Sequence, residues 1–294
     1  MTAAILSIGT ELTRGELINT NAAWLGDELT KLGFDVTEHA TVEDDLDQIV
    51  TQRRRFSEIH RVVIATGGLG PTSDDLTTQA AARAAGVALR RDERVVEGIR
   101  QKFKAFGRVM PESNAKQGDF PEGADILPNP VGTAPGFAMT LGSARLFFVP
   151  GVPREMKHIF RESILLAIAP LAERRTHQVH LRTFGMTESG VAQAVRHLEQ
   201  EHPGLTLGYG AQFPEIEVKV LVRAATERDA SERARAIASE VRGILGDAVF
   251  GGKEDSFAEV VGAALRDKGK TLAVAESCTG GQVGAFNTVT STTG

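Results

Sequence analysis

The 294-residue sequence has a single cysteine, Cys278, no long hydrophobic run and no excess of positive charge. One cysteine excludes an internal disulfide framework and any zinc site built from several thiolates. No apolar stretch reaches the roughly 20 residues that span a bilayer, and the N-terminus has neither the basic flank nor the long apolar core of a signal peptide. A net charge of −5 argues against a nucleic-acid surface as the main binding partner. We therefore expect a cytoplasmic protein that binds neither membranes nor nucleic acid.

The length is sufficient for about two ordinary domains. Strand and helix patterns alternate over residues 1–172, with glycines such as Gly33 and Gly86 closing helices. This alternation predicts an α/β domain with a mostly parallel sheet and helices on both faces, among them helices over Asp74–Ala85 and Met156–Leu171. Residues 173–250 follow a β-α-β-β-α order, which predicts a small α+β connector domain. Residues 251–294 offer a polar linker, one helix and one strand at 272–275, too little for a core, so we expect a fragment of a third domain.

The richest candidate segment is TGGLGPTSDDLT, from Thr66 to Thr77, between a predicted strand and a predicted helix. Its three glycines would let main-chain N–H groups approach a phosphate, and the N-terminus of the helix adds partial positive charge. Asp74 and Asp75 at that position would attract a divalent metal. The competing interpretation is a capped helix after a tight turn. The segment lacks the Lys-Ser/Thr ending of a P-loop.

Two further segments carry polar groups toward the same predicted crevice. Glu11, Asn19 and Asn21 follow the first strand, although Asn21 also suits a helix cap. Asp44 and Asp45 follow the second strand and could reach the crevice, but we expect them to cap the next helix. The loop NPVGTAPG, from Asn129 to Gly136, has a backbone made rigid by proline and glycine. We interpret Glu155 after the PGVP segment at 150–153 as a surface charge.

The order of GTEL…NTN…WL, TGGLGPTSDDLT, NPVGTAPGF, PGVPREM and AESCTGG resembles the CinA family of bacterial competence/damage-inducible proteins along the whole chain. Its N-terminal part is similar to the molybdopterin-binding domain superfamily. The resemblance implies a molybdopterin-binding-like domain, a KH-like connector and a C-terminal deamidase domain that converts nicotinamide mononucleotide to nicotinic acid mononucleotide. The connector lacks a GXXG clamp, so we expect a structural or oligomerising role and a homodimer.

The resemblance further implies that the N-terminal domain hydrolyses ADP-ribose to AMP and ribose 5-phosphate with Mg²⁺, Mn²⁺ or Co²⁺. The expected catalytic residues are Asp74, Asp75 and Glu11, with Asp74 and Asp75 as metal ligands. The alternative is a non-catalytic protein that binds molybdopterin or a nucleotide. In either case the residues expected to contact the ligand are Asn19, Asn21, Thr66, Gly67, Gly68, Gly70, Thr72, Asn129, Gly132 and Thr133.

Ser277 in AESCTGG matches the deamidase serine of the family. The family domain continues for more than a hundred residues, and the segment after this motif, QVGAFNTVTSTTG, departs from the usual pattern. We therefore expect an incomplete C-terminal domain, a vestigial Ser277 and no deamidase activity.

Overall fold

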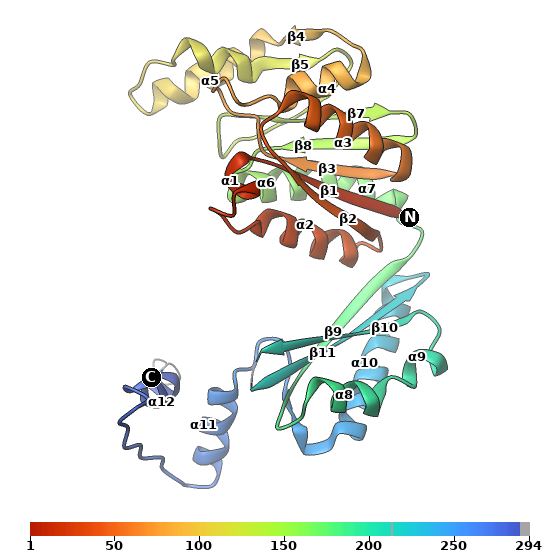
Figure 1. The fold of residues 1–294 in the computed structure, drawn as a ribbon, viewed down its shortest axis with the longest axis vertical. Helices are drawn as coiled ribbons and strands as arrows, with labels where there is room; N and C mark the ends of the chain where they lie inside the picture. Colours follow the sequence, from red (N-terminus) through yellow and green to blue (C-terminus); the bar gives the residue numbers. More distant parts are fainter. Residues whose placement is uncertain (213, 289–294) are drawn as a thin grey trace. The chain divides into compact units, whose positions relative to one another are not determined.

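The computed structural model describes residues 1–212 and 214–288 and divides into two compact units, which we describe separately (Figure 1). The first unit comprises Met1–Arg174 and the second begins at Arg175.

The first unit is built on a six-stranded sheet in the order β2-β1-β3-β8-β7-β6. Strands β2, β1, β3 and β8 are parallel, whereas β7 and β6 run antiparallel to their neighbours. The predicted mostly parallel sheet is therefore confirmed. The bounds are β1 (Thr2–Ile8), β2 (Asp35–Val42), β3 (Val62–Thr66), β6 (Asp125–Leu127), β7 (Gly136–Leu141) and β8 (Ala144–Val149), with a separate pair β4 (Leu89–Arg91) and β5 (Asp119–Pro121).

Helices cover both faces of this sheet, as predicted (Figure 1). One apolar core forms beneath α3 and α4, and a second forms beneath α2, α6 and α7. The helices of the unit are α1 (Thr10–Thr13), α2 (Thr20–Lys31), α3 (Leu46–Ile59), α4 (Thr77–Ala85), α5 (Glu93–Ala105), the 3₁₀ helix η1 (Glu112–Gly118), α6 (Pro153–Ile159), the π turn η2 (Phe160–Ile164), α7 (Leu165–Ile168) and the 3₁₀ turn η3 (Ala169–Leu171).

The connections place the ends of three neighbouring strands together. The chain leaves β1 through α2 to β2 on one side, then returns through α3 to β3 on the other side. The space between β1 and β3 is therefore a topological switch point, where open α/β sheets bind ligands at the carboxyl edge. The register pairs Ser7 with Thr66 and Thr66 with Val149, so β1, β3 and β8 end at the same level.

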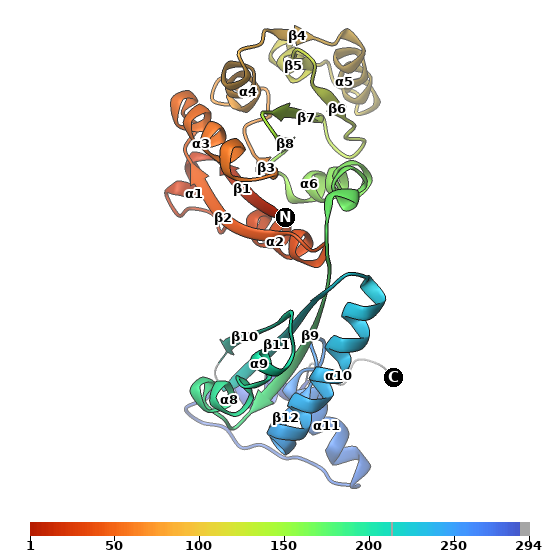
Figure 2. The same cartoon turned by 90° about the vertical axis from the view of Figure 1, so that its right-hand side faces the viewer.

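The second unit begins with a four-stranded antiparallel sheet in the order β10-β11-β9-β12. Its helices bury apolar residues against the sheet, with α10 contributing the largest share (Figure 2). This arrangement confirms the predicted KH-like α+β fold. The bounds are β9 (Arg175–Phe184), α8 (Glu188–Val195), α9 (Leu198–Glu201), β10 (Leu205–Gln212), β11 (Glu215–Ala224), α10 (Glu227–Leu245), η4 (Gly246–Ala248) and β12 (Val249–Gly251).

Two helices follow β12. Helix α11 (Phe257–Asp267) begins with a capping box in which Ser256 and Glu259 bond reciprocally, and α12 (Gln282–Thr288) comes after the AESCTGG segment. The predicted strand at 272–275 is wrong, since the described chain forms no strand there and exposes Leu272 and Val274. Residues 289–294 of the expected third segment lie outside the described residues.

Two predicted helices differ from the structure for physical reasons. Helix α4 begins at Thr77 rather than at Asp74, because Asp75 instead closes a turn by accepting hydrogen bonds from Thr72. The single helix expected over 156–171 is interrupted by the π turn η2. In the part of the chain that the structure describes, every helix is too short or too polar to cross a bilayer.

Candidate functional site

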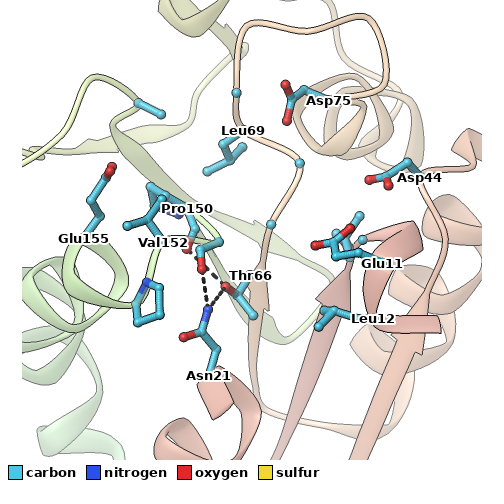
Figure 3. A pocket seen from close by; sticks show the side chains of 18 of the residues that line it. Glu11, Leu12, Asn21, Asp44, Thr66, Leu69, Asp75, Pro150, Val152 and Glu155 are labelled. Atoms are coloured by element: carbon cyan, nitrogen blue, oxygen red, sulfur yellow. Dashed lines mark hydrogen bonds between the residues drawn. The ribbon is translucent and has the colours of Figure 1, made fainter. Parts of the chain in front are cut away.

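A pocket of about 640 Å³ opens where β1, β3 and β8 end (Figure 3). Ten of the predicted site residues line it, and they come from segments far apart in the sequence. These are Glu11, Asn19, Asn21, Thr66, Gly67, Gly68, Gly70, Asp74, Asp75 and Thr133. The structure thus brings the two N-terminal motifs together at the switch point with two residues of the NPVGTAPG loop, Thr133 and Ala134.

The glycine loop between β3 and α4 requires glycine at two positions. Gly67 and Gly68 adopt φ values of 106° and 64°, in the left-handed region. A Cβ atom on Gly67 would lie 2.0 Å from the carbonyl oxygen of Ile8, and one on Gly68 would lie 2.3 Å from Oγ1 of Thr77. Thr77 Oγ1 donates to the Gly67 carbonyl at 2.8 Å and fixes the loop to α4.

Main-chain donors of this loop are available to a ligand. Within the described residues, the N–H groups of Gly68, Leu69 and Gly70 have no hydrogen-bond partner, whereas Gly67 donates to Val149. Buried polar groups of a protein are nearly always paired, so consecutive unpaired amides beside a pocket favour an anionic ligand group there.

Asn21 and Thr66 connect the floor of the pocket to the loop after β8 (Figure 3). Asn21 Nδ2 donates to Gly151 O at 2.7 Å and to Thr66 Oγ1 at 3.3 Å, and Thr66 Oγ1 donates to Pro150 O at 3.1 Å. The buried Asn21 Oδ1 has no partner among the described residues. The helix cap of α2 is Asn19, whose Oδ1 accepts from Ala22 N and whose Nδ2 donates to Ser7.

Five of the residues that line the pocket are acidic, namely Glu11, Asp44, Asp74, Asp75 and Glu155. Among the described residues, no Lys, Arg or His lines this pocket. Figure 3 shows Glu11 and Asp44 on one side and Glu155 on the other. Asp44 accepts from the N–H and hydroxyl of Thr10 at 2.8 and 2.9 Å. The expected helix cap is therefore wrong for Asp44, which lines the pocket, whereas Asp45 caps α3 by accepting from Gln48 N. Asp75 accepts from the N–H and hydroxyl of Thr72 at 2.8 and 2.6 Å.

These contacts bear on the expected metal. Among the described residues, ligand atoms of three acidic or histidine side chains come within 4.8 Å of one another only at Glu201, His202 and Glu240 in the second unit. Glu11, Asp74 and Asp75 do not form such a group, and Asp75 is engaged by Thr72. The residues therefore do not fit a ready-made metal site, and we derive no chemical step through a metal. The cation stays a prediction.

Three of the residues predicted to contact the ligand do not line the pocket. Thr72 holds Asp75, Asn129 is buried behind the pocket, and Gly132 supports the side chain of Glu155. Lys102 donates to the carbonyls of Asn129 and Gly132, the latter at 2.6 Å, and partial burial lowers the pKa of Lys102. These residues shape the loop rather than the surface of the pocket.

Sequence reasoning missed Glu155 and the apolar rim of the pocket. Glu155 follows β8 directly after the PGVP segment, so its place at the carboxyl edge of a parallel strand was the available signal. Leu17, Ile18 and Val152 line the pocket with 60%, 89% and 53% of their surface exposed. Large apolar side chains at the mouth of a pocket suit a flat organic ring.

Ser277 belongs to the second unit and is exposed in a turn before α12. Its carbonyl accepts from Gly280 N at 3.2 Å. The neighbouring Glu276 accepts from Val283 N at 2.9 Å and Gly284 N at 2.6 Å, and these main-chain hydrogen bonds lower the pKa of Glu276. The carboxylate thus fastens the turn that carries Ser277 to the start of α12.

Three family models match successive parts of the chain. They describe a probable molybdopterin binding domain at residues 4–171, a damage-inducible protein CinA KH domain at 178–251 and a CinA C-terminal domain at 254–294. A CinA-like protein of Frankia casuarinae is 42% identical over 96% of this chain and 67% of its own length. The chain belongs to the CinA family. This membership confirms the resemblance inferred from the motifs.

Further similar proteins support the same family membership. A CinA-like protein of Anaeromyxobacter sp. is 38% identical over 94% of this chain and 67% of its own length. The crystal structure of the protein CinA with unknown function from Thermoplasma acidophilum is 35% identical, with a TM-score of 0.52, over 57% of this chain and 97% of that one. The CinA family is associated with hydrolase activity of the deamidase kind.

These findings correct two expectations. The predicted ADP-ribose pyrophosphatase activity is wrong, because the matched family models and relatives indicate a molybdopterin-binding-like domain and CinA domains rather than a diphosphatase. In the pocket, the expected catalytic carboxylates Glu11, Asp74 and Asp75 do not form a group of three possible metal ligands among the described residues. The expectation of only an incomplete fragment after residue 250 is also corrected, since the model of the CinA C-terminal domain matches residues 254–294.

Proposed function

We propose that the pocket of the first unit binds a phosphorylated pterin, in the manner of a molybdopterin-binding domain. The observation that carries this proposal is the run of unpaired N–H groups at Gly68, Leu69 and Gly70 beside a pocket at the switch point of the sheet. Main-chain amides suit phosphate oxygens because their positions are fixed by the fold. The family model for a probable molybdopterin binding domain supports the same ligand class.

The rest of the pocket suits the organic part of such a ligand. Ile18 and Val152 would cover a flat ring, while Asn21 Oδ1 and Thr66 offer polar contacts on the floor. Since no cationic side chain of the described residues lines the pocket, the phosphate would depend on the loop amides. A change in the loop should therefore weaken binding more than a change in a distant surface charge.

Isothermal titration calorimetry with neopterin monophosphate tests this function. We expect saturable binding to the full chain and a loss of about tenfold or more in Gly70→Ala, because the new Cβ would lie 2.5 Å from the Asp75 carboxylate and displace the loop. Gly98→Ala is the matched control, because a Cβ there meets nothing within 4 Å. Absence of binding at millimolar ligand, with the protein folded by circular dichroism, would refute the proposal.

A second candidate function concerns the C-terminal segment. We propose that it contributes to the hydrolytic deamidation of nicotinamide mononucleotide, with Ser277 as the nucleophile. The match of the CinA C-terminal domain to residues 254–294 favours it, and the turn that Glu276 fastens presents Ser277 to solvent. A serine exposed in a tight turn can reach a substrate carbonyl, although it needs a base to become reactive.

Ammonia release from nicotinamide mononucleotide tests this second function. We expect release by the full chain and its loss in Ser277→Ala. Ser231→Ala, which changes a serine of α10, should leave the rate unchanged. Release that persists in Ser277→Ala would remove this serine from the reaction, and no release by the unmodified chain would refute the activity itself.

A further inference from the structure

A group of three metal-ligating side chains lies in the second unit, and neither proposed function uses it. Glu201 ends α9, His202 follows it directly, and Glu240 belongs to α10. One ligand atom from each side chain lies within 4.8 Å of the other two. Among the described residues, no other three histidine, cysteine or acidic side chains come together in this way. The second unit therefore holds a set of donors that can close around one cation.

The donor set joins one imidazole nitrogen to two carboxylates. His202 Nε2 lies 3.0 Å from Glu240 Oε2. Two ligand atoms of a tetrahedral zinc ion lie about 3.3 Å apart, because each is about 2.0–2.1 Å from the metal. The histidine and Glu240 thus already have nearly the separation that a shared cation requires. The side chain of Glu201 is exposed and has the freedom to complete the set.

The two carboxylates of this group have no lysine or arginine to neutralise them. Within the described residues, Glu240 pairs with His202 alone, and Glu201 makes neither an ion pair nor a side-chain hydrogen bond. The positions three and four residues from Glu240 on α10 are apolar or glycine, so the helix itself supplies no cation. Two carboxylates close to one another repel, and a divalent cation between them removes that repulsion.

The turn that carries His202 is held from several sides. The His202 N–H donates to Leu198 O at 2.9 Å, and the His202 carbonyl accepts from Leu205 N at 3.1 Å. The next carbonyl along the chain, that of Pro203, accepts from Nη2 of Arg233 on α10 at 2.5 Å. The end of α9 is therefore fixed to α10 before any ion binds. Ligands on rigid supports lose less conformational entropy when they close around a cation.

We infer that Glu201, His202 and Glu240 bind one Zn²⁺ ion, which clamps the end of α9 to α10. Zinc accepts both imidazole nitrogen and carboxylate oxygen, whereas Mg²⁺ and Ca²⁺ prefer sites made of oxygen alone. His202 supplies Nε2, the atom next to the Glu240 carboxylate. Three protein ligands leave the fourth position of the metal to water. The site depends on neither proposed function, because its effect is on the stability of the second unit.

Isothermal titration calorimetry of the full chain with ZnCl₂, after removal of metals with EDTA and dialysis, tests the site. We expect His202→Asn, Glu240→Gln and Glu201→Gln each to weaken one bound equivalent by about tenfold or more, since even the loss of an outer-shell partner of a metal ligand costs about 10- to 100-fold. The matched controls are His197→Asn, which changes an exposed histidine before α9, and Glu232→Gln, which changes an exposed glutamate of α10. Both controls should bind zinc as the unmodified chain does.

Thermal unfolding gives a second measurement. Zinc at a hundredfold excess over its Kd should raise the midpoint temperature of unfolding by about 5 °C or more, and EDTA should reverse this rise. The ¹⁵N NMR signal of His202 Nε2 should shift on zinc binding, whereas that of His197 should not.

Two results would overturn the inference. Equal zinc binding by the unmodified chain and by His202→Asn and Glu240→Gln would place the metal elsewhere. Absence of zinc binding at millimolar concentration would leave His202 and Glu240 as an ion pair without a metal. Unfolding curves in EDTA show whether each variant is folded, and a misfolded His202→Asn leaves the Glu240→Gln comparison decisive.

Discussion

A Cβ atom placed on Gly67 would lie 2.0 Å from the carbonyl oxygen of Ile8. The two residues belong to adjacent parallel strand ends, and their backbones approach so closely because Gly67 has a φ of 106°. Both the free space and the backbone conformation therefore demand glycine at this position.

Replacement of Gly67 by alanine should destabilise the protein by about 2 kcal/mol or more, because it combines a main-chain clash with an unfavourable φ. Urea denaturation monitored by circular dichroism measures the change. In contrast, Gly98→Ala within α5 has open space and should stabilise the protein by about 0.5–1 kcal/mol. Equal stability of the two variants would contradict the close approach of Gly67 and Ile8.

The turn between Thr72 and Asp75 leads to a second prediction. Asp75→Ala removes two hydrogen bonds from Thr72 and should destabilise the protein by about 1 kcal/mol while weakening the binding of neopterin monophosphate. Asp74→Ala removes the same charge from an exposed side chain, whose pKa is lowered by Thr72 and Lys116, so it should alter stability less than Asp75→Ala does. Calorimetry on both variants separates the hydrogen bonds from the charge. Indistinguishable variants would show that the turn does not organise the loop.

Arg53 provides a third test. It is fully buried in the core beneath α3, its Nε and Nη1 have no partner among the described residues, and its guanidinium lies 4.6 Å from the Phe148 ring centroid. Burial lowers the pKa of Arg53 to about 9, so near pH 7 the group carries its charge at a desolvation cost.

Arg53→Met should therefore keep stability at pH 7 or raise it by about 1–2 kcal/mol, because an apolar side chain of similar length removes that cost. The measurement is the urea concentration at the midpoint of unfolding, compared between proteins whose free energy of unfolding depends equally steeply on urea. Arg14→Met on the exposed surface is the control and should be neutral. A loss of more than about 1 kcal/mol in Arg53→Met would mean that the cation–π contact outweighs desolvation.

His60 predicts how stability depends on pH. Burial lowers the pKa of this histidine, whose side chain is 2% exposed, although the nearby Glu38 acts in the opposite direction. The unfolded chain then binds a proton more readily than the folded one below pH about 6.5, so stability should fall as the pH drops from 6.5 toward 5. Urea denaturation across this range should show a smaller decline in His60→Gln. An unchanged decline would assign the pH dependence to other groups.

The fold could be predicted because its signals are local and repeated. Apolar strands followed by helices, some of them closed by a glycine such as Gly86, indicate the parallel sheet and the place of the glycine loop. The exact start of α4 could not be predicted, because the side chain of Asp75 can either cap a helix or close a turn with Thr72. Only the surrounding loop decides between these two local hydrogen bonds.

The candidate site could be predicted in part. The motifs place Asn21, Thr66 and Gly68 at one sheet edge, and the structure brings them together. The interpretation of Glu155 as a surface charge overlooks its position after β8, which was a signal for the sheet edge. Its hydrogen bond to Asn129, 26 residues away in sequence, could not be read from one segment. The predicted metal site at Asp74 and Asp75 stays a prediction, and within the described residues these two side chains do not form a group of three possible ligands with Glu11.

The three strands that end together beneath the pocket contribute mainly backbone and a few small side chains to it, while the surrounding loops contribute most of the chemistry. The two apolar cores lie on the two faces of the sheet; Leu69 and Ala134 of the loops pack into one of them, whereas the rim residues Leu17, Ile18 and Val152 belong to neither. Substitutions that retune the preferred compound can therefore accumulate along the rim without disturbing the scaffold. We therefore expect relatives that prefer other ligands to differ mainly at the rim of the pocket. Gly67 should stay unchanged among them, because its backbone conformation and its approach to Ile8 require glycine.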